Sequence, residues 1–219
     1  QWKQGLPFYD LIITTKSYNV KELLSMGAKR VEFMNNSYDT EIHKPVKISQ
    51  IDKKKFGGSV GFIGAWEKER SKSISFLAEA GIKVRWWGGG WSNKAFSPNV
   101  QNLVYENDAL WGHDYAKAIN AFDINLCFLR KMNRDLQTTR SIEIPACGGF
   151  MLAERTEEHQ ILFEEAKEAD FFSSNEELLD KIKFYLANSN IRRKIAQAGR
   201  ERCEKSGYSN DLAISKIIL

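Results

Sequence analysis

Two carboxylates and three cations lie within one short stretch in the second half of the chain. They are Lys131, Arg134, Asp135, Arg140 and Glu143. An apolar run precedes the stretch at residues 124–129, and another follows it at residues 150–153. Runs of this kind are typical of buried parallel strands. The charged stretch is therefore expected to form a turn that leads from a strand into a helix.

Thr138 and Thr139 lie where that helix should begin. A helix start has unpaired backbone N–H groups and the positive end of the helix dipole, so it favours phosphate. Arg134 and Arg140 would add guanidinium donors of fixed geometry. Glu143 can accept two hydrogen bonds from a ribose diol. These residue types together predict a site for a sugar diphosphate.

Each of these residues also has a purely structural interpretation. Glu143 would serve equally well as a carboxylate that stabilises the helix dipole. Asp135 is placed either to bond sugar hydroxyls and stabilise positive charge at an anomeric carbon, or to bond its own backbone in a turn. His113, which follows Gly112, is a general base, a neighbour of a nucleobase, or simply a residue at a helix start.

Two glycine turns follow other expected strands. Gly64 comes after an apolar run at residues 59–63, with Arg70 one turn into the next helix, and Gly88 opens a run of three glycines. Glycine lets the backbone approach a ligand closely. The glycine run lacks the spacing of a dinucleotide fingerprint, and no Cys/His spacing indicates a metal site.

Strands and helices alternate along most of the chain. Strands are expected at 59–63, 82–87, 102–105, 124–129, 150–153 and 170–172, and helices at 67–80, 113–122, 157–166, 176–187 and 190–205. This alternation predicts an α/β fold with a doubly wound, parallel, Rossmann-like sheet. Ligands bind such sheets at the carboxyl ends of the strands, so the turns named above should open on one edge.

The first part of the chain has its own short pattern of strand, helix and strand at residues 9–14, 19–26 and 30–34. A β-α-β piece of this size cannot cover both of its faces. We therefore expect residues 1–45 to be the tail of an upstream domain, 46–57 a linker, 58–206 the ligand-binding domain and 207–219 a helix that crosses back. The alternative is that the first piece joins the edge of the downstream sheet.

Composition narrows the functional classes. The 219 residues carry 32 basic and 28 acidic side chains, a net charge of +4, which does not indicate nucleic acid. The three cysteines are odd in number, so we expect a reducing compartment rather than a disulfide framework. No apolar run is long enough to span a bilayer. The expected location is the cytoplasm, or the inner face of the membrane as a peripheral protein.

The chain resembles the C-terminal, donor-binding half of GT-B glycosyltransferases, in particular the CgeB-like (spore-maturation) branch of the group 1 glycosyl transferases. The most specific segment is Arg140-Ser-Ile-Glu-Ile-Pro-Ala-Cys-Gly-Gly149, which resembles the family's segment around the second Glu of its E-x7-E motif. Less specific are residues 60–64 and 84–88 and the helices at 176–187 and 191–202. The resemblance implies that Glu143 binds the donor ribose and that backbone amides of residues 137–139 hold the diphosphate.

The same resemblance implies that residues 9–56 are the end of an acceptor domain and a hinge. The first position of the motif is Asp135 rather than Glu, one methylene shorter. A family pair of Arg and Lys aligns with Ala65 and Arg70, so one phosphate cation is absent there, and Arg134 or Arg140 is expected to replace it.

The expected function is therefore transfer of a sugar from a nucleotide-diphosphate sugar to a glycan, protein or lipid acceptor, without a cofactor or a necessary metal. Asp135 and His113 are the expected catalytic residues. The expected donor-binding residues are Gly64, Arg70, Gly88, Arg134, Thr138, Thr139, Arg140 and Glu143. The alternatives are a nucleotide-sugar-binding module that does not turn over, such as one half of a split enzyme, or a scaffold that self-associates through residues 1–45. The other expected partners are a second copy of the chain, in a homodimer, or an N-terminal domain that this sequence lacks.

Overall fold

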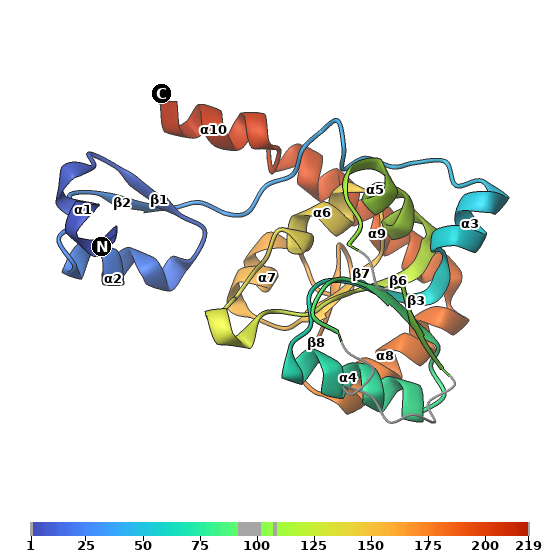
Figure 1. Cartoon of the computed structure of the whole chain (residues 1–219). Coiled ribbons are helices and arrows are strands. Elements are labelled where there is room, and N and C mark those ends of the chain that lie inside the picture. Colours follow the sequence, from blue (N-terminus) through green and yellow to red (C-terminus); the bar gives the residue numbers. More distant parts are fainter. Residues whose placement is uncertain (1, 92–101, 107–108, 219) are drawn as a thin grey trace.

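The chain forms two separate sheets in a computed structural model that describes residues 2–91, 102–106 and 109–218 (Figure 1). The larger sheet has six parallel strands in the order β5-β4-β3-β6-β7-β8. These strands are β3 (Gly58–Ile63), β4 (Val84–Trp87), β5 (Leu103–Tyr105), β6 (Phe122–Cys127), β7 (Met151–Glu154) and β8 (Asp170–Phe172). The doubly wound parallel sheet expected from the sequence is confirmed.

Helices cover both faces of the larger sheet. They are α3 (Gln50–Phe56), α4 (Lys68–Glu79), α5 (Gly112–Ala121), α6 (Arg140–Ala146), α7 (Glu157–Leu162), α8 (Asn175–Ala187) and α9 (Ser189–Lys205). Helices α4 and α8 pack on one face, and α5, α6 and α7 pack on the other (Figure 1). The result is a three-layer arrangement with a core on each side of the sheet.

Side chains of the central strands alternate between these two cores, as strand geometry requires. Leu126 and Leu152 point toward the core that α4 and α8 share, while Cys127, Met151 and Ala153 enter the core formed with α5, α6 and α7. Each of these five side chains is buried. Burial on both faces explains why the central strands are continuous apolar runs rather than alternating ones.

The strand order reverses between β3 and β6. β3 pairs with β4 on one side and with β6 on the other, and the chain then winds outward in opposite directions from these two strands. Loops that follow strands on the two sides of such a point diverge and leave a crevice at the carboxyl ends, where ligands bind in open α/β sheets. The topology thus fixes where a site should be sought.

The smaller sheet belongs to the N-terminal piece, residues 2–33. Its strands β1 (Ile12–Thr14) and β2 (Val31–Phe33) are parallel and, within the described residues, pair only with each other. The helical elements are α1 (Trp2–Gly5), η1 (Leu6–Phe8) and α2 (Ser17–Ser25). The buried core is small and consists of Leu6, Leu23, Ala28 and Val31. The N-terminal piece therefore does not join the larger sheet, contrary to the alternative considered from the sequence.

A connector of residues 34–49 leads from the N-terminal piece to α3. The sequence predicted a linker over residues 46–57, but residues 50–56 form helix α3. Ser49 Oγ accepts a hydrogen bond of 3.0 Å from the amide of Asp52, and the Asp52 carboxylate accepts one from the amide of Ser49. This capping box stabilises the helix start, and the polar composition of the segment concealed it.

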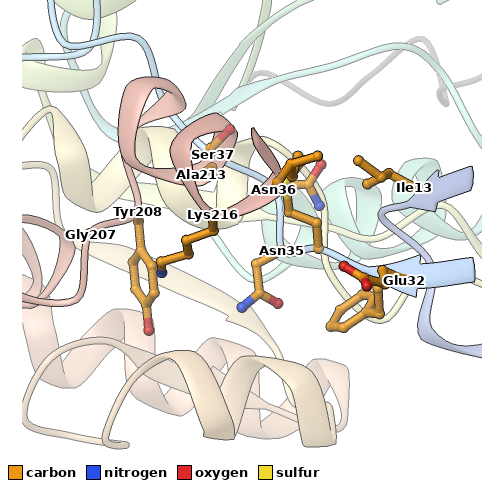
Figure 2. Close-up of a pocket in the computed structure, with 12 residues that line it drawn as sticks. Ile13, Glu32, Asn35, Asn36, Ser37, Gly207, Tyr208, Ala213 and Lys216 are labelled. Carbon is orange, nitrogen blue, oxygen red and sulfur yellow. The ribbon is translucent and has the colours of Figure 1, made fainter. Parts of the chain in front are cut away.

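The connector passes beside the turn between α9 and α10 (Asn210–Ile218). Tyr38 donates its amide to the carbonyl of Tyr208 at 3.1 Å and accepts the amide of Asn210 at 2.9 Å. Helix α10 then extends toward the N-terminal piece (Figure 1). Ala213 and Lys216 of this helix share a groove of about 220 Å³ with Ile13, Glu32 and other residues of the N-terminal piece and the connector (Figure 2).

Candidate functional site

A cleft of about 450 Å³ lies at the carboxyl ends of β3 and β4, at the side of the sheet where the strand order reverses. Residues from the connector, the loops after β3 and β4, helix α5 with the segment before it, and the start of α6 form its walls. The lining residues are Ile42, His43, Ile63, Gly64, Ala65, Gly88, Gly89, Ala109, Leu110, Trp111, Gly112, Tyr115, Thr139, Arg140 and Glu143. Five residues expected from the sequence to bind a ligand are among them: Gly64, Gly88, Thr139, Arg140 and Glu143.

The loops after β3 and β4 contact each other through their backbones, at positions occupied by glycine. The amide of Gly64 donates to the carbonyl of Trp87 at 2.8 Å, and the amide of Trp66 donates to the carbonyl of Gly89 at 2.9 Å. Gly88 has φ of +139°, and a Cβ there would lie 2.1 Å from the carbonyl oxygen of Gly64. A side chain does not fit at this position, so the backbones of Gly64 and Gly88 approach each other closely at the cleft wall.

Glu143 lies on the cleft wall with two aromatic neighbours. Its Oε2 accepts a hydrogen bond of 2.7 Å from the hydroxyl of Tyr115, and its Oε1 lies 3.8 Å from Nε2 of His43. The pKa of Tyr115 is raised well above its usual value, mainly by burial and secondly by the negative charge of Glu143. Tyr115 therefore stays protonated and acts as a donor. The Glu143 side chain is 16% exposed, so one carboxylate faces the cleft without being fully solvated.

His43 reaches the cleft from the connector. The amide of Asp39 donates to Nδ1 of His43 at 3.1 Å, so Nδ1 is an acceptor and, in the neutral ring, Nε2 carries the proton that faces Glu143. The ring packs edge-on against Tyr115, with centroids 5.7 Å apart. A residue of the connector thus contributes directly to the wall around Glu143.

Arg140 is the cation of the cleft. It lies one turn before Glu143 on α6, an i, i+3 spacing that places the two side chains on the same side of the helix. Within the part of the chain that the structure describes, its Nε is buried and has no hydrogen-bond acceptor. A buried donor without an acceptor is costly and rare in folded proteins. This arrangement leaves a guanidinium free to bind an anion.

Arg70, in contrast, is not in the cleft. It is only 3% exposed, and it donates hydrogen bonds to the carbonyl oxygens of Ala65 at 3.0 Å, Phe128 at 3.3 Å and Leu129 at 3.4 Å. It therefore ties the loop after β3 to the end of β6. The sequence predicted a phosphate-binding role, but the donors of this guanidinium already have main-chain acceptors.

The charged turn after β6 contacts the N-terminal piece. Asp135 forms an ion pair of 2.5 Å with Lys16, and Arg134 binds the Glu22 carboxylate through two hydrogen bonds of 2.9 and 3.0 Å. Neither Asp135 nor Arg134 lines the cleft. Their expected roles at the sugar and the diphosphate therefore have no support in this arrangement, because partners more than a hundred residues away in the sequence already bind them.

Two further residues expected at the site lie outside the cleft lining. The amide of Thr138, expected to hold a diphosphate, donates instead to Oγ of Ser141 at 3.0 Å. His113, expected to be a catalytic base or a nucleobase neighbour, is exposed and lies outside the cleft lining. Trp111, two residues earlier, lines the cleft and is 81% exposed.

Tyr115, His43 and Trp111 were not expected from the sequence to line the site. No local motif distinguishes them, because a tyrosine inside a helix, a histidine in a connector and a tryptophan before a helix are ordinary residues. Only the packing of α5 and the connector around α6 brings them to one cleft. Among the described residues, no group of three or more His, Cys, Asp or Glu side chains is arranged to hold a metal ion, and no helix is long and apolar enough to cross a bilayer.

Sequence comparison decides the family. The model of the glycosyl transferase-like family matches residues 70–217, which is more than half of the chain. This chain belongs to the glycosyl transferase-like family. No curated protein matches it significantly. The matched region of this glycosyl transferase-like protein begins in α4 and contains Arg140, Glu143 and Tyr115 of the cleft.

Solved structures share the fold. HepE of Anabaena, in complex with UDP and glucose, superposes with a TM-score of 0.75 at 14% identity, over 98% of this chain and 63% of that one. A sucrose-phosphate synthase from Thermosynechococcus elongatus gives a TM-score of 0.67 at 16% identity, over 98% of this chain and 58% of the other. The C-terminal domain of a group 1 family glycosyl transferase from Francisella tularensis gives 0.59 at 15% identity, over 79% and 99%.

These similarities show the GT-B fold of glycosyltransferases. The glycosyl transferase-like chain spans 58% and 63% of the lengths of the synthase and HepE, so it corresponds to part of those proteins. It covers nearly the whole of the Francisella domain.

Proposed function

We propose that this chain binds a nucleotide-diphosphate sugar in the cleft at the strand reversal and serves as the donor side of a glycosyltransferase. The observation that carries the proposal is the pairing on one face of α6 of Glu143, a partly exposed carboxylate, with Arg140, whose buried Nε has no acceptor within the described residues. A nucleoside diphosphate needs an acceptor for ribose hydroxyls and a cation for phosphate. The binding of UDP by HepE, which has the same fold, supports this class of ligand.

Each wall of the cleft has a proposed role. Glu143, oriented by Tyr115, accepts hydrogen bonds from the ribose hydroxyls, with His43 beside it. Arg140 and the backbone of the two glycine loops bind the diphosphate. The apolar side chains of Leu110 and Trp111 provide a surface for the nucleobase.

The proposed chemistry follows from this placement. When the bond between the anomeric carbon and the diphosphate breaks, the leaving nucleoside diphosphate gains negative charge. A guanidinium that lines the cleft stabilises that charge, and electrostatic stabilisation of this kind is usually the largest single contribution to catalysis. We therefore propose Arg140 as the residue that stabilises the leaving group.

A titration of two nucleotides tests the role of Glu143. Wild-type protein should bind UDP more tightly than 2′-deoxy-UDP by about tenfold, because a hydrogen bond to a charged group is lost with the hydroxyl. Glu143→Ala should weaken UDP binding and remove the difference between the two ligands. Asp135→Asn, which changes a carboxylate in the loop before α6 and outside the cleft lining, should leave both affinities unchanged. A Glu143→Ala protein that discriminates as wild type does would contradict the proposal.

A binding module without turnover is the second candidate function. Within the described residues, the N-terminal piece contributes a two-stranded sheet with a small core. The chain spans 58% of the sucrose-phosphate synthase and 65% of HepE in complex with UDP-glucose. Release of UDP from UDP-glucose, with and without added glycan acceptors, separates the two functions. Turnover supports the enzyme, whereas tight binding without turnover supports the module.

We further propose that residues 58–206 form the donor domain of a CgeB-like transferase and that residues 1–45 belong to an acceptor-type domain. The match to an isolated C-terminal domain supports this division. We also propose a reducing, cytoplasmic location. Cys127, Cys147 and Cys203 are free and buried, and burial raises the pKa of each thiol, so none is poised for disulfide exchange.

A further inference from the structure

A chain of buried hydrogen bonds connects helix α7 with the turn that precedes α6. Nδ1 of His159 lies 2.6 Å from the carbonyl oxygen of Glu154, and Nε2 lies 2.7 Å from Oγ of Ser141. Oγ of Ser141 in turn lies 3.0 Å from the amide nitrogen of Thr138. His159 and Ser141 are both fully buried. None of these contacts has a role in the ligand chemistry described above.

The direction of each hydrogen bond follows from its partners. A carbonyl oxygen only accepts, so Nδ1 of His159 donates to Glu154. Burial lowers the pKa of His159, so the ring is neutral and its Nε2 accepts the hydroxyl proton of Ser141. The lone pairs of the Ser141 oxygen then accept the amide of Thr138. Both ring nitrogens and the hydroxyl are satisfied in one consistent arrangement.

The ring orientation is also fixed. The imidazole of His159 stacks on the ring of Phe171 in β8, with centroids 5.7 Å apart and planes 7° from parallel. Thr156, which caps the same helix, accepts the amide of His159 at 3.1 Å and donates its hydroxyl to the carbonyl of Leu136 at 2.6 Å. The cap of helix α7 therefore binds residue 136 directly through Thr156, whereas His159 reaches the amide of residue 138 only through Ser141 of α6.

The turn leads directly to the ligand-facing residues of the cleft. Thr139 and Arg140 follow Thr138 in the chain and line the cleft, and Glu143 lies on the first turn of α6. The direction in which this short helix starts depends on the conformation of the turn. The side chains of a binding site must be held in position to within about 0.5 Å by the residues that support them.

We propose that His159 is a positioning residue of the cleft: its neutral imidazole fixes, through Ser141, the turn that presents Thr139, Arg140 and Glu143 to a nucleoside diphosphate. The choice of ligand rests on the proposed function, whereas the positioning itself does not. His159 does not line the cleft. Its ring accepts a hydrogen bond from Ser141 of α6 and donates one to the carbonyl of Glu154 in β7.

Three variants of the full chain test this inference. His159→Leu removes both hydrogen bonds of the ring, and His159→Gln keeps an amide oxygen near the place of Nε2 to accept from Ser141. Tyr185→Phe is the matched control, because it removes a buried hydrogen bond of 2.6 Å, to Asp170, on the opposite face of the sheet. Thermal unfolding identifies a temperature at which all the proteins are folded. At that temperature, UDP affinity is measured by calorimetry and amide exchange by mass spectrometry.

His159→Leu should weaken UDP binding about tenfold and raise amide exchange selectively in residues 136–143. His159→Gln should recover most of the affinity, and Tyr185→Phe should lower thermal stability without changing either quantity. Unchanged exchange in residues 136–143 of the folded Leu variant would overturn the positioning role, whatever the ligand. If wild-type protein binds no UDP, the proposed function fails, while the exchange comparison still decides on His159.

Discussion

The hydroxyl of Tyr115 and the carboxylate of Glu143, joined by a 2.7 Å hydrogen bond, connect α5 to α6 at the wall of the cleft. The bond occupies one carboxylate oxygen. The other lies 3.8 Å from Nε2 of His43, which is longer than a hydrogen bond. One oxygen of Glu143 is therefore fixed by the protein, and the second retains capacity for a ligand hydroxyl.

Tyr115→Phe should weaken UDP binding about fivefold, because a hydrogen bond that orients the carboxylate is lost while the ring remains. Calorimetric titration at neutral pH measures this change. Tyr208→Phe is the control, since its hydroxyl donates to the carbonyl of Leu162 at 3.2 Å, outside the cleft lining. Equal losses of affinity in the two variants would show that the effect is not specific to Glu143.

Arg140→Gln should reduce affinity for UDP by about tenfold or more and leave the weak affinity for uridine unchanged, because the guanidinium acts on phosphate alone. Arg134→Gln tests the turn residue that the sequence also favoured. Its guanidinium is bound to Glu22, so we expect no change in UDP affinity. A loss in the Arg134 variant with none in the Arg140 variant would reverse the assignment.

Gly88→Ala should destabilise the protein by more than about 2 kcal/mol, since the added Cβ meets a carbonyl oxygen and φ is positive. Gly89→Ala is a neighbouring control, because a Cβ at that position meets no atom within 4 Å. We expect a change within about 0.5 kcal/mol for this control. Urea denaturation gives both values, and similar losses at the two positions would contradict the close approach of the loops.

Burial lowers the pKa of His159 from 6.5 to about 4. The unfolded chain therefore binds the proton more readily, so the free energy of unfolding should fall as pH decreases through the interval from 6.5 to 4. The loss contributed by this residue reaches at most about 3 kcal/mol below that interval. Carboxylates titrate in the same range, so the measured quantity is the difference in pH dependence between wild type and His159→Gln. Parallel curves for the two proteins would contradict a neutral buried histidine.

The larger sheet could be predicted from the sequence because each of its strands and helices has a recognisable local pattern of apolar residues. Continuous apolar runs such as residues 124–129 indicate strands buried on both faces, and their alternation with helices determines a parallel doubly wound sheet. Gly64 and Gly88 follow strands directly, and Arg140 and Glu143 lie in the helix after the loop that follows β6, so the same topology brings all four to one edge. Their presence in the cleft was predictable for this reason.

The remaining site residues depend on contacts between distant parts of the chain. Asp135 and Arg134 have the composition of a ligand-binding turn, yet they bind Lys16 and Glu22, which are 119 and 112 residues away. His43 reaches Glu143 only because the connector runs along the domain. Residue types and spacing contain no information on such pairings. The sequence therefore could not distinguish the residues of the turn that face the cleft from those that contact the N-terminal piece.

The paired backbones of Tyr38 and of the turn before α10 have a mechanical consequence. The chain passes between the N-terminal piece and the sheet domain along the connector, and α10 returns toward that piece from the same point. The two segments that lead from the sheet domain toward the N-terminal piece are hydrogen-bonded to each other at this one place, so we expect a rotation of one part against the other to pivot there. Separation of the parts then requires the ion pairs Lys16–Asp135 and Glu22–Arg134 to open, and ionic strength sets how easily they do.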